Sequence, residues 1–128
     1  MGMMQGSHIL LFSTDTNADR DFFRDVLEFK NVDAGGGWLI FKLPPSEIAL
    51  HPGSATKKKG HLGEKTMNCE FYFICNNLAK VMKKLKSKKV KCSPAIKEGW
   101  GIRTTVLLPS GGRIGLYQPM HESAYKLK

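Results

Sequence analysis

The stretch Leu-Pro-Ser-Gly-Gly-Arg-Ile-Gly-Leu-Tyr-Gln-Pro at residues 108–119 has a counterpart earlier in the chain, Leu-Pro-Pro-Ser-Glu-Ile-Ala-Leu-His-Pro at residues 43–52. Both stretches begin with Leu-Pro and continue into a short apolar segment, and Ile48 and Ile114 are 66 residues apart. Similarity at this spacing indicates an internal repeat of one supersecondary unit. The sequence therefore predicts two copies of the same module.

The residues around these stretches predict the order β-α-β-β-β in each half of the chain. Asp15 or Asn17 caps a first helix that ends near Leu27, because Phe22, Phe23, Val26 and Leu27 form one apolar stripe. A second helix is predicted from Asn77 to about Ser87. The predicted strands are 8–13, 29–32, 38–43 and 47–51 in the first half, with a glycine turn at 35–37, and 68–75, 89–93, 102–108 and 113–118 in the second.

The 128 residues are the length of one domain, so we expect a single α+β domain over residues 1–128. Its modules are predicted at about 8–52 and 68–119, with a polar loop between them. The apolar runs are far shorter than the roughly 20 residues that cross a bilayer, so no membrane association is expected. The N-terminus lacks the pattern of a secretory signal, which favours the cytoplasm. Cys69, Cys75 and Cys92 are expected to be reduced thiols.

The formal net charge of +9 raises the question of a nucleic-acid partner. Many of the lysines lie on one side of the predicted second helix and in the residues that follow it, with no aromatic side chains between them. Proteins that bind single strands combine a basic groove with stacking aromatic rings. We therefore expect no nucleic-acid partner, and the charge favours a small anionic ligand instead.

The tandem modules resemble the vicinal oxygen chelate superfamily of glyoxalases, extradiol dioxygenases, fosfomycin-inactivating enzymes and bleomycin-binding proteins. The opening residues 8–15, the segment 22–29 and the closing residues 108–117 carry the resemblance, which extends from about His8 to Pro119. Within the superfamily the chain is similar to small glyoxalase-like members. The resemblance implies two βαβββ modules that form a cup from a curled mixed sheet, with the helices on its outer face.

The resemblance also implies a candidate metal site. Metal-dependent members take four ligands from the first and fourth strands of each module, and His8 and Glu70 lie at the two first-strand positions. The fourth-strand positions carry Ala49 and Gly115, which have no donor atoms. Because strand residues alternate between faces, His51 lies on the face of Ala49, and a displaced site of His8, His51 and Glu70 would suit Fe, Mn, Zn or Ni. The alternative is structural, with Glu70 paired to a nearby arginine and His8 in a terminal segment.

Further candidates follow from the same alternation of faces. Tyr117 shares a face with Gly115 and is, with Glu70, a candidate catalytic residue. The candidate ligand-binding residues are Tyr72, Trp100, Arg103 and His121. Arg113 is a second arginine that could recognise an anion. For each of these, packing or a solvated position is the alternative.

Two classes of function remain open from the sequence, which does not decide whether the protein is an enzyme. In the first, a divalent metal holds a small molecule in the cup for lyase, isomerase or dioxygenase chemistry. In the second, a metal-free protein of the bleomycin-resistance type sequesters a drug or metabolite. Both imply a small-molecule ligand, and the resemblance implies a homodimer.

Overall fold

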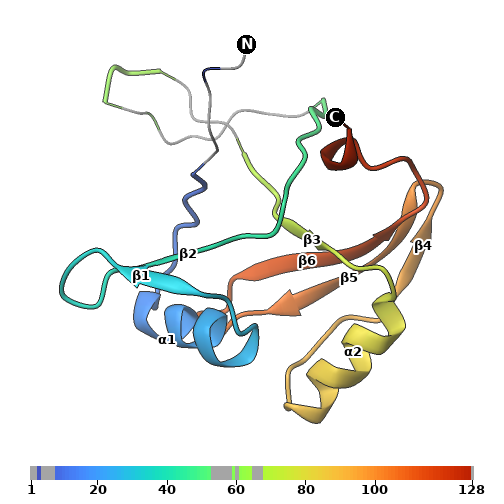
Figure 1. Cartoon of the computed structure of the whole chain (residues 1–128), viewed down its shortest axis with the longest axis horizontal. Coiled ribbons are helices and arrows are strands. Elements are labelled where there is room, and N and C mark those ends of the chain that lie inside the picture. Colours follow the sequence, from blue (N-terminus) through green and yellow to red (C-terminus); the bar gives the residue numbers. More distant parts are fainter. Residues whose placement is uncertain (1–2, 4–7, 53–58, 60, 65–67, 128) are drawn as a thin grey trace. The chain divides into compact units, whose positions relative to one another are not determined.

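The computed structural model describes residues 3, 8–52, 59, 61–64 and 68–127 (Figure 1). Its contacts divide the chain into two compact units. The first contains Met1–Phe41 and the turn Leu108–Gly112, and the second contains Lys42–Leu107 and Arg113–Lys128. Two helices accompany a two-stranded sheet and a four-stranded mixed sheet, which confirms the α+β class. None of the helices that the described residues form is long and apolar enough to cross a bilayer.

The first unit begins with helix α1 (Thr16–Asp21). Asp15 caps this helix, since its Oδ1 accepts a hydrogen bond from the backbone N–H of Ala18 at 3.2 Å. A π-helical turn at Phe22–Val26 follows, in which the N–H of Leu27 donates to the carbonyl of Phe22 at 3.1 Å. The helix predicted to run from Asp15 or Asn17 to about Leu27 is therefore confirmed, with a wider last turn.

An antiparallel hairpin follows the helix in the first unit. Its strands are β1 (Asn31–Asp33) and β2 (Leu39–Phe41), both shorter than predicted. The Asp33 carboxylate accepts the N–H groups of Gly35 at 2.8 Å and Gly37 at 3.2 Å. Glycines 35–37 all have positive φ, a conformation that side chains disfavour, which confirms the predicted glycine turn.

Two strands predicted for the first module are not formed. Residues 8–13 and 47–51 have no regular secondary structure. Leu10, Phe12, Ile48 and Leu50 are between 67% and 88% exposed, so both segments leave large apolar side chains on the surface. A strand exists only where its backbone groups have a partner, and neither segment joins a ladder with other described residues. Apolar composition alone was therefore not sufficient to predict either strand correctly.

The second unit is built on a sheet with the strand order β3-β6-β5-β4 (Figure 1). β3 runs parallel to β6, and the other neighbours are antiparallel. The bounds are Tyr72–Ile74 for β3, Ile96–Glu98 for β4, Gly101–Leu107 for β5 and Arg113–Pro119 for β6. Three strands predicted for the second module are therefore present. The strand predicted at 89–93 is only a bridge from Cys92 to Val106, and β4 was not predicted.

Helix α2 (Leu78–Ser87) covers one face of this sheet and matches its prediction closely. Asn77 caps it through a bond from the N–H of Lys80 to its Oδ1 at 3.1 Å. The N–H of Leu78 donates to Oε1 of Gln118 on β6 at 2.9 Å, which ties the helix to the sheet. The core of the unit lies at this interface and contains Leu78, Leu85, Thr104, Val106, Ile114 and Leu116, all buried.

The opposite face of the sheet, here named the distal face, points away from α2. Side chains alternate along a strand, so residues opposite one another in register share a face. The register pairs Tyr72 with Gly115, Thr105 with Gly115 and Arg103 with Tyr117. The distal face therefore carries Tyr72, Ile74, Ile96, Glu98, Arg103, Thr105, Arg113, Tyr117 and Pro119.

A buried carboxylate organises the first unit. Asp19 in α1 is 8% exposed and accepts three hydrogen bonds. They come from the hydroxyl of Ser13 at 2.6 Å, the N–H of Ser110 at 3.1 Å and the hydroxyl of Ser110 at 2.7 Å. Asp19 thus joins residues 91 positions apart, and an ionised acceptor makes each of these bonds stronger than a neutral one.

We predict that Asp19→Ala lowers the free energy of unfolding by about 2–4 kcal/mol, because it removes a charged acceptor and leaves the Ser110 N–H without its partner. Asp21→Ala is the matched control, because Asp21 is in the same helix but exposed, and its pair with Arg24 contributes about 0.5 kcal/mol or less. Urea denaturation followed by circular dichroism measures both. Equal losses in the two variants would contradict a special role for Asp19.

Candidate functional site

The distal face brings together several of the residues that the sequence indicated. Glu70 lies two residues before β3, and its carboxylate contacts two side chains of this face. Its Oε2 accepts the hydroxyl of Tyr72 at 3.2 Å, and its Oε1 accepts Nη2 of Arg113 at 3.0 Å. The pair is exposed, at 60% for Arg113 and 63% for Glu70. The structural alternative for Glu70, an ion pair with an arginine, is thus observed.

The Tyr72 ring lies directly over Gly115. A Cβ atom at position 115 would overlap the ring, so only glycine leaves room for it there. The space that a side chain would take at this fourth-strand position is therefore filled by an aromatic ring from the neighbouring strand. Partial burial and the charge of Glu70 together raise the pKa of Tyr72, which keeps the phenol neutral at physiological pH.

Three aromatic rings form the centre of the face, and this group is named the aromatic cluster. Tyr72, Trp100 and Tyr117 have centroid distances of 5.4–6.5 Å, and all three pairs are close to perpendicular. Such edge-to-face pairs stabilise each other through the opposite charge of ring face and ring edge. Trp100 is 40% exposed, so the cluster retains a surface that a ligand can contact.

Glu47 is a member of this site that the sequence did not indicate. Its Oε1 accepts the hydroxyl of Tyr117 at 3.0 Å, and its Oε2 accepts the N–H of Ala124 at 2.6 Å. The hydroxyl of Tyr117 also lies 3.4 Å from Nε2 of His121, whose Nδ1 donates to the carbonyl of Glu122 at 2.8 Å. Glu47 has the same parity as Ala49 and His51, and this spacing is the signal that could have found it.

The phenol of Tyr117 has the most strongly shifted pKa of the groups in this site. Its burial, its hydrogen bond to Glu47 and the negative charge of Glu47 raise its pKa to about 12. A phenol held neutral in this way acts as a hydrogen-bond donor and not as a base at physiological pH. His121, predicted as a rim residue, packs against the Tyr117 ring with a centroid distance of 6.0 Å.

Arg103 is on the distal face, but it does not present a free charge. Its Nε and Nη2 donate to Oε1 of Glu98 at 3.2 and 3.0 Å. Both arginines of the face therefore have glutamate partners within the second unit. An anionic ligand would have to compete with these carboxylates.

The proposed metal ligands do not form a donor group in the described part of the chain. No three His, Cys, Asp or Glu side chains of the described residues cluster in a way that could hold a metal ion. Glu70 already accepts two hydrogen bonds, one of them from a cationic guanidinium that would repel a metal. His8 belongs to the first unit, whereas His51 and Glu70 belong to the second. The donors that the second unit presents therefore do not fit a divalent metal, and the full triad stays a prediction.

No family model and no curated protein matches this chain. Solved structures match it over nearly its whole length. TnmS3, an antibiotic binding protein from a Streptomyces species, is 19% identical with a TM-score of 0.59, over 91% of this chain and 98% of that one. A glyoxalase family protein from Enterococcus faecalis is 14% identical with a TM-score of 0.64, over 92% and 100%. The fosfomycin resistance protein FosX from Listeria monocytogenes is 16% identical with a TM-score of 0.56, over 92% and 94%.

These similarities establish the fold, because identities this low carry no information about activity. The chain shares its fold with these glyoxalase family, fosfomycin resistance and antibiotic binding proteins, as the resemblance of the sequence motifs implied. The matched structures include both binding and resistance proteins, so the function has to be argued from the site.

We predict that Glu47→Gln lowers the pKa of Tyr117 from about 12 towards its ordinary value of 10.0, because the substitution removes the negative charge beside the phenol. Near-ultraviolet absorbance, taken as the difference from Tyr117→Phe, measures the titration. Glu122→Gln is the control, since the side chain of Glu122 has no bond to Tyr117. Because the pKa of the Tyr117 phenol is raised in the folded state, its contribution to the free energy of unfolding is fully present below pH 10. This contribution is lost as the pH rises from 10 to about 12. An unchanged titration in Glu47→Gln would contradict this assignment.

Proposed function

We propose that this chain, which shares its fold with glyoxalase family and antibiotic-binding proteins, binds a small organic molecule with a planar ring on the distal face, without a metal ion. The aromatic cluster is the observation that carries the proposal. Its three rings are held by one another, by Glu47 and by Glu70, and Trp100 keeps exposed surface. Ligand sites combine such apolar surface with a few placed polar groups.

The charges of the face favour a ligand with an acidic substituent. The pair between Arg113 and Glu70 is exposed, and exposed pairs contribute only about 0–1 kcal/mol. A ligand carboxylate can therefore replace Glu70 as the partner of Arg113 at little cost, and a guanidinium binds a carboxylate through two parallel hydrogen bonds. His121 and Arg103 flank the cluster and would complete the contact with the ligand. TnmS3 supplies a precedent for antibiotic binding on this fold.

The second candidate is a metal-dependent enzyme of the glyoxalase or dioxygenase type. It is favoured by Glu70, which lies on the same face as the aromatic cluster, and by the glyoxalase family and fosfomycin resistance proteins among the matched folds. In that function His8, His51 and Glu70 would hold iron, manganese, zinc or nickel, which would act as a Lewis acid. Glu70 and Tyr117 would be the catalytic groups.

The architecture and location complete the proposal. We infer one domain over residues 1–128, with βαβββ modules at about 8–52 and 68–119 and a curled sheet that forms a cup. The second module supports this, since its helix and three of its predicted strands are present in order. Free thiols at Cys69, Cys75 and Cys92 support the reducing cytoplasm.

The two candidates make different predictions for 2-naphthoate, a planar probe with one carboxylate, used beside neutral 2-naphthol. If the protein is a metal-free binder, we expect 2-naphthoate to quench the tryptophan fluorescence of chelator-treated protein. We expect 2-naphthol to bind more weakly than 2-naphthoate. Trp100→Ala should weaken 2-naphthoate binding about tenfold, since a lost aromatic pair costs about 0.5–1.5 kcal/mol beyond the lost contact area. Trp38→Ala is the control, because Trp38 is an exposed tryptophan of the first unit. Calorimetry gives the affinities of both variants.

The metal-dependent enzyme would give the opposite result. Wild-type protein loaded with each metal and dialysed would then retain a near-stoichiometric amount by elemental analysis, and both His51→Ala and Glu70→Ala would lose it. Equal affinities of Trp100→Ala and Trp38→Ala for 2-naphthoate would contradict the proposal that the aromatic cluster is the ligand site.

We also propose that the chain forms a homodimer. Residues 9–12 expose four consecutive apolar side chains, and their backbone groups join no sheet of the described residues. Apolar surface of this kind is normally covered by a partner. Light scattering at micromolar concentration should give twice the chain mass of 14.3 kDa. A monomeric mass would contradict the proposal.

A further inference from the structure

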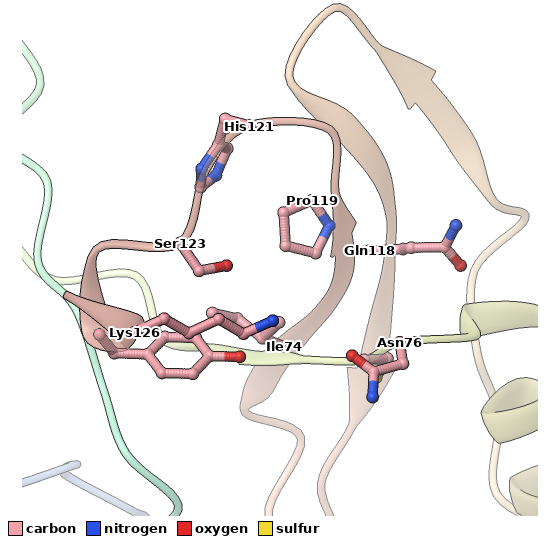
Figure 2. Close-up of a pocket in the computed structure, with 9 residues that line it drawn as sticks. Ile74, Asn76, Gln118, Pro119, His121, Ser123 and Lys126 are labelled. Carbon is pink, nitrogen blue, oxygen red and sulfur yellow. The ribbon is translucent and has the colours of Figure 1, made fainter.

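A concave feature lies beside the aromatic cluster, where β3 and β6 end. It is a pocket of about 230 Å³ between these strand ends and the segment that contains Ser123–Lys126 (Figure 2). Drug-sized ligands occupy roughly 300–1,000 Å³, so this volume suits a smaller molecule. Its lining residues are Ile74, Cys75, Asn76, Gln118, Pro119, His121, Ser123, Tyr125 and Lys126.

Several hydrogen-bond donors are among the residues that line the pocket. Figure 2 shows the hydroxyl of Ser123 and the ammonium of Lys126 directed into the same space, facing Ile74 and Pro119. The side chain of Gln118 turns away from this space, consistent with its bond to the N–H of Leu78. The hydroxyl of Tyr125 adds another group that can donate.

The ammonium of Lys126 lies 6.0 Å from the centre of the Tyr125 ring and has no carboxylate partner among the described residues. None of the ion pairs between described residues includes Lys126. Glu47, the carboxylate that fixes this segment, uses its two oxygens for Tyr117 and the N–H of Ala124. Within the described residues, Ser123 and Tyr125 also have no hydrogen-bond partner for their hydroxyl groups. A cation and two hydroxyls thus line a concave site that has no carboxylate among its lining residues.

We propose that this pocket binds a small anion, with a carboxylate or phosphate group held by Lys126 and Ser123. Both groups offer several oxygen acceptors, and hydrogen bonds between an ammonium and an ionised oxygen are among the strongest in proteins. Glu47 positions the site, because its bond to the N–H of Ala124 sets the start of the turn Ala124–Lys126. Lys126 and Ser123 are not part of the aromatic cluster, although His121 borders both sites.

Acetate and inorganic phosphate are the probes, because neither has a ring that could bind the aromatic cluster. Titration of the full-length chain, followed by amide chemical shifts, should move the signals of residues 118–126 and leave those of α2 unchanged. The comparison of the two anions shows which oxygen group the pocket prefers. We expect Lys126→Met to weaken binding of the preferred anion about tenfold.

Lys83→Met is the matched control, since Lys83 is exposed on α2 and its loss lowers the net charge by the same amount. Ser123→Ala is a second variant, expected to weaken binding less than Lys126→Met while leaving the charge unchanged. Equal weakening by Lys83→Met and Lys126→Met, or shifts spread over the lysines of α2, would mean that the anions only screen the basic chain. Either result, or the absence of any shift at residues 118–126, would overturn the proposal.

Discussion

Parallel pairing of β3 with β6 places Tyr72 opposite Gly115, and the contacts of the distal face depend on this register. It aligns residues that are 43 positions apart, so that Arg113 reaches the Glu70 carboxylate. A shift of one residue would turn Phe71 and Phe73 to the distal face and move Tyr72 towards α2. Hydrophobic burial prevents this shift, because Ile114 and Leu116 are almost completely buried on the α2 side. The helix interface thus specifies the geometry of the opposite face.

The charge of the chain and the charge of the site are different quantities. Most lysines around α2 are exposed, and that helix contains no acidic residue. On the distal face, by contrast, Arg103 and Arg113 each have a glutamate partner. Net charge therefore describes the solvated surface of this protein, while the ligand recognition that we propose for the face depends on which ion pair a ligand can exchange. An exposed pair, such as that between Arg113 and Glu70, is the one most readily exchanged.

Sequence patterns predicted the parts of the structure that interactions between residues close in the sequence determine. The apolar spacing of α2, its Asn77 cap and the alternation along β5 and β6 are visible in the residues themselves, and they place Tyr72, Arg103 and Tyr117 on one face. The strands at 8–13 and 47–51 could not be judged in this way, because a strand also requires a pairing partner. The role of Glu47 could not be predicted for a related reason. Its spacing from Ala49 and His51 indicates only a shared face, whereas its contacts with Tyr117 and Ala124, 70 and 77 residues away, depend on the tertiary structure.

The bonds of Asp19 have a consequence for how the chain acquires its structure during translation. Two of its three donors belong to Ser110, which is synthesised 91 residues after Asp19. Proteins are synthesised from the N-terminus at about 5–20 residues per second, so α1 waits several seconds before that serine leaves the ribosome. Until then a carboxylate that is buried in the finished protein has only Ser13 as a partner. The environment of Asp19 is therefore completed only once Ser110, 91 residues later in the chain, has been made.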